Sequence, residues 1–158
     1  MRIAYFPLQT AQNSGPVYNA VLDCLQARGF RTEENSMTAD AAVIWSVLWH
    51  GRMAGNELVY RHYRNQNKPV ICIEVGALYR GKTWKIALNH INRLGYYGHT
   101  ENLDWDRPRK LGISLAVTAF HRPEILIAAQ HKNSLQLEGI NQESWITTQI
   151  ERIRQFSD

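Results

Sequence analysis

Two continuous apolar runs dominate the pattern of hydrophobic and polar positions along this chain. They are Ala41–Trp49 and Pro69–Glu74. Neither run alternates apolar with polar residues, and both contain Val and Ile, which is typical of strands buried on both faces of a parallel sheet. Between them, Asn56–Arg64 has apolar residues at helical spacing and a capping residue, Asn56, at its start. This order predicts a right-handed βαβ unit.

The segments on either side continue the alternation of strands and helices. A strand is expected at Arg2–Phe6, a helix from Pro16 to a stop at Gly29, and a short strand at Phe30–Glu34. Further along, Ile125–Ala129 is another buried-strand run, and Asn141 caps a last helix with isoleucines on one face.

Two segments between these elements are less regular. Gly81–Gly95 fits a helix capped by Thr83, but its apolar residues also satisfy the period of a strand, so both alternatives stay open. Leu111, Ile113 and Leu115 alternate as in a strand.

Together the elements predict an α/β fold, in the form of a Rossmann-like three-layer α/β/α sandwich with a mainly parallel sheet. Residues 1–122 are expected to form the N-terminal domain. Residues 123–158 would supply a strand and a helix that either complete this domain or start a truncated second one.

Composition narrows the class of protein. Of the 158 residues, 44% are apolar and 20% are charged, so the chain can fill a core and is not typical of a disordered protein. The longest apolar run is far shorter than the roughly 18 residues of a membrane span, and the N-terminus begins a strand rather than a signal peptide. A cytoplasmic protein is therefore predicted, with Cys24 and Cys72 as small buried hydrophobes in a reducing compartment.

Polar loops follow both central strands, and ligands of open α/β sheets bind at the carboxyl ends of the strands. The first loop holds His50 and Arg52, and the second begins at Glu74 and reaches Arg80 and Lys82. The cationic side chains of Arg52, Arg80 and Lys82 are suited to binding the phosphate of a nucleotide or of a DNA backbone. The net charge of +4 and the sequence pI near 9.2 are compatible with such a partner, although a dedicated DNA-binding domain is usually more basic.

The common sequence signatures of cofactor sites are absent from these loops. The chain lacks G-x-G-x-x-G and G-x-x-x-x-G-K-[ST], and its histidines and cysteines do not have the spacing of zinc ligands. Neither a metal nor another cofactor is predicted.

Five stretches of the sequence share their order and spacing with one known group of proteins. They are Trp49-His-Gly-Arg-Met53, Lys68-Pro-Val-Ile71, Glu74-Val-Gly76, Arg80-Gly-Lys-Thr-Trp-Lys85 and Ile125-Leu-Ile-Ala-Ala-Gln-His-Lys-Asn-Ser-Leu-Gln136. Through these stretches, which span most of the chain, it resembles phage-encoded proteins with the two-Rossmann-domain architecture of GT-B glycosyltransferases. Some enzymes of that kind attach sugars to phage DNA bases.

This resemblance implies the transfer of a sugar from a nucleotide-sugar donor to a hydroxyl, with a modified DNA base as one candidate acceptor. An inverting transfer needs a base that takes the acceptor proton, and His50 or Glu74 would have that role. The loop after Ile125–Ala129 would face the donor diphosphate, and its candidate ligands are Gln130, His131, Lys132 and Ser134. A phage-encoded protein would work in the cytoplasm of the host.

The resemblance also implies a second domain that continues beyond this sequence. The strand at Ile125–Ala129 would be the first strand of that donor-side domain. The chain is then either a fragment that contains the acceptor-side half, or a compact relative that completes its site by pairing with another copy or another chain.

Two other functions are compatible with the same residues. The order of Asp40, Val43-Ile44, Glu57 and Lys68-Pro-Val-Ile71 loosely resembles nucleoside deoxyribosyltransferases, in which Glu57 would be the nucleophile. The chain would otherwise be a non-catalytic module that binds a nucleotide or nucleic acid.

Overall fold

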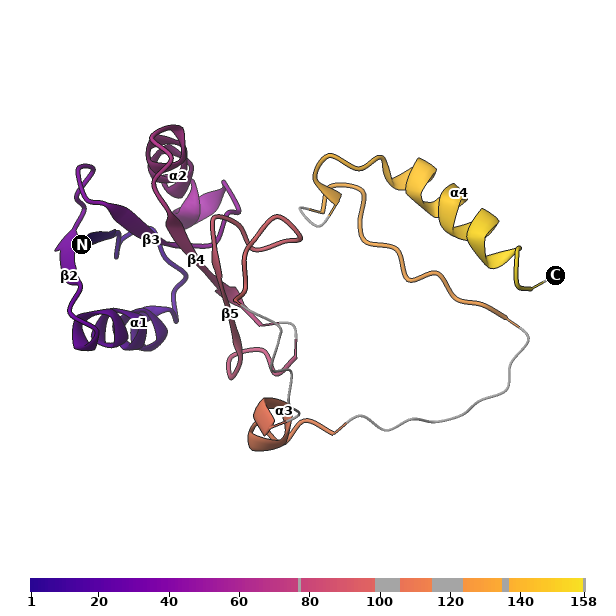
Figure 1. The fold of residues 1–158 in the computed structure, drawn as a ribbon, viewed down its shortest axis with the longest axis horizontal. Helices are drawn as coiled ribbons and strands as arrows, with labels where there is room; N and C mark the ends of the chain where they lie inside the picture. Colours follow the sequence, from indigo (N-terminus) through magenta and orange to yellow (C-terminus); the bar gives the residue numbers. More distant parts are fainter. Residues whose placement is uncertain (77, 99–105, 115–123, 135–136, 158) are drawn as a thin grey trace. The chain divides into compact units, whose positions relative to one another are not determined.

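Five strands form one sheet, in the order β2-β1-β3-β4-β5 (Figure 1). Their bounds are β1 (Arg2–Tyr5), β2 (Arg31–Glu34), β3 (Ala41–Trp45), β4 (Val70–Val75) and β5 (Trp84–Leu88). Parallel pairing joins β2, β1, β3 and β4, whereas β5 runs antiparallel to β4. The predicted Rossmann-like α/β fold with a mainly parallel sheet is confirmed.

The structure is a computed structural model that describes residues 1–76, 78–98, 106–114, 124–134 and 137–157. The chain divides into two units, Met1–Gly98 and His99–Asp158. The first contains the sheet and three helices: α1 (Gly15–Ala27), the short 3-10 helix η1 (Gly51–Met53) and α2 (Asn56–Asn65). The second contains α3 (Asp106–Lys110) and α4 (Gln142–Ile153). The predicted domain boundary after residue 122 lies outside the described residues and stays a prediction.

Helices α1 and α2 cover opposite faces of the sheet (Figure 1). Each connects two parallel strands, and the two crossovers leave the centre of the sheet in opposite directions. All five residues of β3 are buried, because alternate side chains of this central strand face the two helical layers. This explains why the sequence of β3 is continuously apolar.

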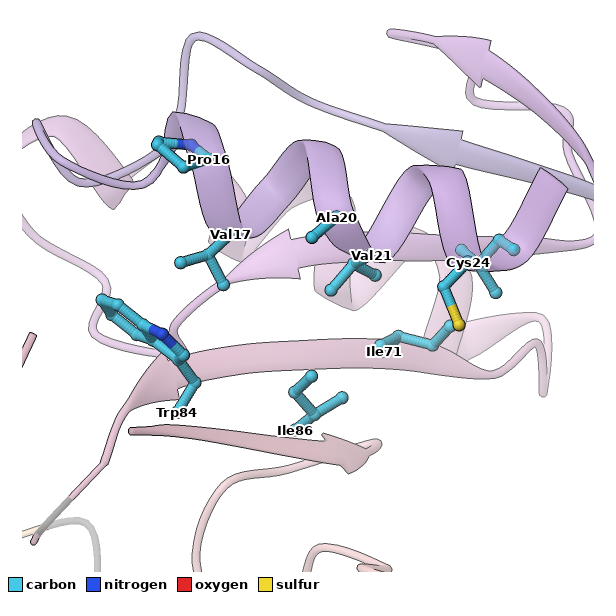
Figure 2. Close-up of a pocket in the computed structure, with 9 residues that line it drawn as sticks. Pro16, Val17, Ala20, Val21, Cys24, Ile71, Trp84 and Ile86 are labelled. Atoms are coloured by element: carbon cyan, nitrogen blue, oxygen red, sulfur yellow. The ribbon is translucent and has the colours of Figure 1, made fainter. Parts of the chain in front are cut away.

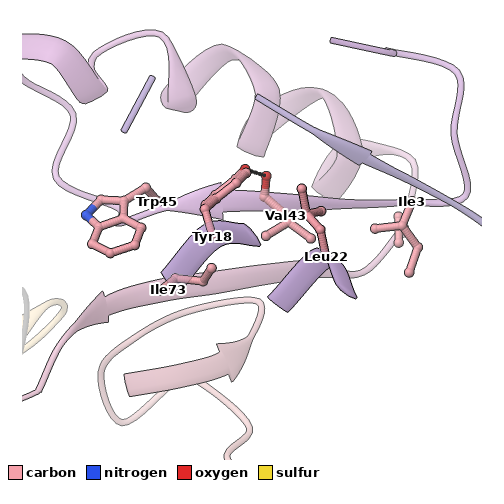
Figure 3. Close-up of a cluster of buried hydrophobic side chains, with 7 residues drawn as sticks. Ile3, Tyr18, Leu22, Val43, Trp45 and Ile73 are labelled. Atoms are coloured by element: carbon pink, nitrogen blue, oxygen red, sulfur yellow. Dashed lines mark hydrogen bonds between the residues drawn. The ribbon is translucent and has the colours of Figure 1, made fainter. Parts of the chain in front are cut away.

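A core of buried side chains packs between α1 and the sheet (Figure 3). It is formed by Ile3, Tyr18, Leu22, Ala41, Val43, Trp45 and Ile73. The Tyr18 hydroxyl donates a hydrogen bond to the carbonyl oxygen of Val43 (2.7 Å) and accepts one from the backbone N–H of Phe6 (3.1 Å). Burial raises the pKa of this hydroxyl well above its usual value, so it keeps its proton. Tyr18 therefore ties β1 to β3 where the two strands stop pairing.

Removal of the Tyr18 hydroxyl tests how much its two hydrogen bonds between β1 and β3 stabilise the fold. Tyr18→Phe is expected to lower the free energy of unfolding by about 2 kcal/mol, because two buried backbone groups lose their partner. The measurement is urea unfolding of the variant and of the wild type. The matched control is Tyr5→Phe, since the Tyr5 hydroxyl makes only an exposed 3.2 Å hydrogen bond to Glu34. Equal stabilities of the two variants would contradict the proposed tie.

The structure decides the two alternatives for Gly81–Gly95 in favour of a strand. Strand β5 pairs with β4 along its whole length, and Thr83 caps no helix, since its hydroxyl donates to the carbonyl oxygen of Tyr79 (3.3 Å). A turn at Asn89, with φ of +68°, ends the strand. The alternation of Trp84, Ile86 and Leu88 was therefore the correct signal.

The predicted strand at Leu111–Leu115 is wrong within the described residues. Leu111 and Ile113 belong to a turn that follows α3, in which Gly112 has φ of +66°. The backbone N–H of Ile113 donates to the carbonyl oxygen of Pro108 (2.9 Å), so local capping of the helix overrides the alternating pattern. Leu115 lies outside the described residues.

The predicted buried strand at Ile125–Ala129 is also wrong. These residues form no strand, and Leu126 is 89% exposed. A strand of this kind needs neighbours that pair with it, and the described residues of the second unit supply none. The predicted cap of α4 is confirmed, because Asn141 Oδ1 accepts a hydrogen bond from the backbone N–H of Ser144 (3.0 Å).

The two cysteines differ in environment. Cys72 is buried as predicted, and burial raises the pKa of its thiol to about 12. Cys24 is exposed, so the prediction of a second buried thiol is wrong. It belongs to the apolar face of α1, but its part of that face lies beside an open groove over β4 and β5 rather than against the core.

Candidate functional site

Strands β1 and β3 are neighbours, but their connections leave in opposite directions, β1 toward β2 and β3 toward β4. At such a position the loops after the two strands separate, and the crevice between them is the usual ligand site of an open α/β sheet. A crevice of about 500 Å³ lies here, which we call the switch-point crevice. It is lined by Pro7, Leu8, Thr10, Ala11, Gln12, Ser14, Gly15 and Arg52.

One wall of the crevice is the loop between β1 and α1. Short-range hydrogen bonds hold this loop, since the Thr10 hydroxyl donates to the carbonyl oxygen of Pro7 (3.0 Å) and the Ser14 hydroxyl to that of Ala11 (2.7 Å). Ser14 is buried and precedes α1, but its side chain does not cap the helix. The backbone N–H groups of the first helical turn therefore have no side-chain cap from Ser14.

Asn56 fastens the same loop to the end of β3. Its amide nitrogen donates to the carbonyl oxygens of Gln9 (2.8 Å) and Trp45 (2.6 Å), and its side chain is fully buried. The predicted cap by Asn56 is wrong: Gly55 is the capping residue of α2, and Asn56 is the first residue within the helix. Its side chain reaches back to the sheet instead of to the helix backbone.

Two features make the switch-point crevice suitable for an anion. The N-terminus of α1 lies at the crevice through Gly15, and the free N–H groups and dipole of a helix N-terminus attract negative charge. Arg52 lines the crevice from η1, and its guanidinium makes no ion pair or side-chain hydrogen bond within the described part of the chain. Among the predicted site residues, Arg52 is the one that lines this crevice.

His50 lies two residues before Arg52, in the same loop. It precedes η1 in an extended conformation, and its backbone N–H donates to the carbonyl oxygen of Leu48 (2.8 Å). Its side chain is exposed and does not line the switch-point crevice. The structure thus places His50 at the predicted edge of the sheet, two residues before Arg52, which lines the crevice.

Glu74 is half-buried and already engaged by its neighbours. Its carboxylate accepts hydrogen bonds from the Ser46 hydroxyl (2.5 Å) and from the backbone N–H of Val75 (2.7 Å). Ser46 is fully buried with φ of +64°, a conformation that costs on the order of 1 kcal/mol for a residue with a side chain. Glu74 therefore stabilises the sharp exit of the chain from β3.

Arg80 and Lys82 are exposed in the turn between β4 and β5. The carbonyl oxygen of Tyr79 accepts hydrogen bonds from the backbone N–H groups of Lys82 (2.9 Å) and Thr83 (3.0 Å), and Gly81 has φ of +82°. This turn lies at the carboxyl end of β4, the same edge of the sheet as the crevice. Neither cation lines the crevice itself.

The remaining predicted residues, Gln130, His131, Lys132 and Ser134, lie in a turn of the second unit. The backbone N–H of Ser134 donates to the carbonyl oxygen of His131 (2.7 Å), and its hydroxyl to the side chain of Gln130 (3.4 Å). Gln142, the first residue of α4, donates to the carbonyl oxygen of Gln130. The turn is therefore joined to the start of α4.

Sequence reasoning missed most of the residues that line the crevice. Thr10, Gln12 and Ser14 were not among the predicted site residues. The order of the strands is the signal that identifies this loop, and it becomes visible only when β3 is known to pair with β1.

Comparisons with protein-family models and with curated protein sequences gave no significant match to this chain.

Within the described residues, no group of three or more His, Cys, Asp or Glu side chains is placed to hold a metal ion. The prediction of no metal overlooks one Asp-x-Asp motif, Asp104-Trp105-Asp106. Such a motif bears on this prediction because carboxylates are common ligands of divalent cations. Asp104 and Trp105 lie outside the described residues. No helix in the described part of the chain has the length and apolar character needed to cross a membrane.

Proposed function

We propose that the protein binds a phosphate-bearing substrate in the switch-point crevice. The observation that carries this proposal is the position of Arg52, which lines the same crevice as the N-terminus of α1 with no ion pair or side-chain hydrogen bond among the described residues. A guanidinium can donate two parallel hydrogen bonds to a phosphate, and a helix N-terminus supplies further donors. A nucleotide and a DNA phosphodiester share this chemistry.

The bound substrate would take part in glycosyl transfer, with this chain as the enzyme or as its acceptor-binding half. A bond forms between the acceptor oxygen and the anomeric carbon of the sugar, the bond from that carbon to the donor diphosphate breaks, and the acceptor proton passes to a base. His50 is the better candidate for this base, because its side chain is exposed beside the crevice loop, whereas the carboxylate of Glu74 is engaged by Ser46 and Val75. A cytoplasmic location, in the host for a phage-encoded protein, belongs to the same proposal.

DNA is one candidate acceptor. Arg80 and Lys82 project from the turn at the same edge of the sheet as Arg52, and such cations would contact successive phosphates of a strand laid along that edge. The turn that holds Gln130, His131, Lys132 and Ser134 remains the candidate for the donor diphosphate. A second copy or a partner chain that completes the site is compatible with this proposal.

The two other functions, a deoxyribosyltransferase and a non-catalytic binding module, depend on different parts of the structure. A deoxyribosyltransferase would need a free carboxylate at Glu57, but the Glu57 side chain forms an ion pair with Arg61 (2.7 Å) on the surface of α2. No observation therefore favours this function. A non-catalytic module would use the same crevice as the proposed enzyme and would differ only in the lack of turnover.

A thermal-shift and calorimetric screen of the full chain tests the proposal. The ligands are nucleotide sugars, nucleoside diphosphates, deoxynucleosides and short DNA, each also assayed for transfer with wild type and with His50→Ala. A ligand that binds only native protein stabilises it by about 2.7 kcal/mol at 100 times its dissociation constant. We expect a phosphate-bearing ligand to raise the melting temperature, and His50→Ala to abolish transfer without abolishing binding.

Each result assigns the protein to one of the functions. Stabilisation by a nucleotide sugar with turnover supports a transferase, and binding without turnover supports the binding module. Stabilisation by uncharged deoxynucleosides alone, or by no ligand, would contradict phosphate recognition at the crevice.

A further inference from the structure

An apolar groove of about 570 Å³ lies between α1 and the strands β4 and β5 (Figure 2). Val17, Ala20, Val21 and Cys24 of α1 line one side, and Trp84 and Ile86 of β5 line the other. Figure 2 shows these side chains pointing toward one another across the groove. Ile86 is 47% exposed, so the groove is open to an added apolar group.

The backbone of β5 is open along the same groove. In the antiparallel ladder with β4, the backbone N–H of Gly76 donates to the carbonyl oxygen of Thr83, and that of Asn89 to the carbonyl oxygen of Val70. Hydrogen-bonded pairs alternate along such a ladder, so the backbone groups of Trp84 and Ile86 point away from β4. These two residues thus present unpaired N–H and C=O groups at the edge of the sheet, within the described part of the chain.

One residue of this edge already has a partner. The backbone groups of Leu88 and Tyr96 exchange two hydrogen bonds of 2.9 and 3.0 Å in an antiparallel bridge. The Tyr97 hydroxyl then bonds to the carbonyl oxygen of Ile91, and Gly98 has φ of +104°; Tyr97 and Gly98, the last described residues of this segment, are not in a strand. Within the described residues, the edge of β5 therefore accepts an antiparallel segment at Leu88 and has no backbone partner at Trp84 and Ile86.

The charge of Lys85 determines which side chain an added strand should place opposite it at the edge of β5. It lies between Trp84 and Ile86, with its side chain on the opposite face of the sheet. Its neighbour on β4 is Glu74, whose carboxylate is engaged by Ser46 and Val75, and no ion pair of Lys85 lies within the described residues. A second copy paired through β5 about a two-fold axis at Lys85 would place two lysines directly opposite each other, which is unfavourable.

We propose that the edge of β5 is a docking site for an extended peptide with the pattern apolar–acidic–apolar. The peptide would add a sixth strand, antiparallel to β5, and its backbone would pair with Trp84 and Ile86. The two apolar side chains would enter the groove beside α1, and the acidic side chain would lie opposite Lys85 on the other face. The groove and the switch-point crevice have no lining residue in common, and this proposal does not depend on the proposed function.

The test uses the full chain and a synthetic peptide, fluorescein-Thr-Thr-Val-Glu-Val-Thr-Thr-amide, which carries the dye on its N-terminal amine, with binding followed by anisotropy. One control peptide has Lys in place of Glu, and another is N-methylated at both Val residues, which removes their backbone donors and leaves the side chains unchanged. We expect the parent peptide to bind at least about tenfold more tightly than either control, because one control replaces an attractive charge pair with a repulsive one and the other loses two backbone hydrogen bonds. Amide hydrogen exchange at Trp84 and Ile86 should slow in the complex.

Two variants of the protein complete the test. Lys85→Glu should reverse the preference, so that the Lys peptide binds more tightly than the Glu peptide. Ile86→Pro should abolish binding and retain the wild-type circular dichroism spectrum, because the N–H that it removes points away from β4. Equal binding of all three peptides, no binding of any, or an unchanged preference in Lys85→Glu would overturn the proposal. A concentration-dependent dimer that is lost in Ile86→Pro would also overturn it, since the edge would then be occupied by a second copy.

Discussion

Asn56→Asp is expected to destabilise the protein at pH 7 by about 3 kcal/mol or more. The two side chains have the same shape, but the amide nitrogen of Asn56 donates to the carbonyl oxygens of Gln9 and Trp45, and its side chain is fully buried. An ionised aspartate there would bring a negative charge against two carbonyl oxygens, without water to solvate it. The loss should appear in urea unfolding as a lower midpoint.

The effect of this substitution should depend on pH in one direction. Burial beside acceptors would raise the pKa of the introduced carboxyl in the folded state above its value in the unfolded chain. The unfolded state then loses its proton first, so stability relative to wild type falls as pH rises from about 4 until the folded-state pKa is passed. Below about pH 4 the difference from wild type should be smallest.

Asn19→Asp is the matched control for this charge change, because Asn19 is an exposed residue in the N-terminal half of α1. It should change the free energy of unfolding by less than about 0.5 kcal/mol at any pH in the same range. If Asn56→Asp were as stable as Asn19→Asp at pH 7, the buried amide could not be the link between the loop and the sheet.

Arg52→Ala should weaken the binding of phosphate-bearing ligands by about 10- to 100-fold. A charge-assisted hydrogen bond contributes about 1.5–3 kcal/mol, and each 1.4 kcal/mol corresponds to a factor of ten in the dissociation constant. The Arg52 side chain is exposed and makes no ion pair among the described residues, so its removal should leave the melting temperature of the free protein unchanged. Calorimetric titration with the ligand identified in the screen measures the change.

Arg31→Ala separates a specific contact from the general effect of charge. Arg31 is also exposed, but it lies at the start of β2, at the amino end of the parallel strands. Its loss should change the dissociation constant by less than about twofold. Equal losses of affinity in the two variants would place the phosphate outside the switch-point crevice.

The sequence by itself determined the elements of the central sheet. The apolar runs of β3 and β4 and the helical spacing in α1 and α2 are local periodic patterns, and they predicted these elements within a few residues. The rule that ligands bind at the carboxyl ends of parallel strands then pointed to the loops that hold Arg52 and Glu74. Such predictions succeed because a strand that is buried on both faces needs an apolar residue at nearly every position.

Only the tertiary structure decided what those residues do. The apolar residues of Gly81–Gly95 fitted both a helix and a strand in the sequence, and only the pairing with β4 decided for the strand. The role of Asn56 depends on a hydrogen bond to Gln9, 47 residues away in sequence, and Cys24 is exposed because α1 extends beside an open groove. The crevice itself exists because β3 pairs with β1, whose loop supplies most of its lining. Local patterns report periodicity and capping, whereas these features arise between segments that are distant in sequence and adjacent only after folding.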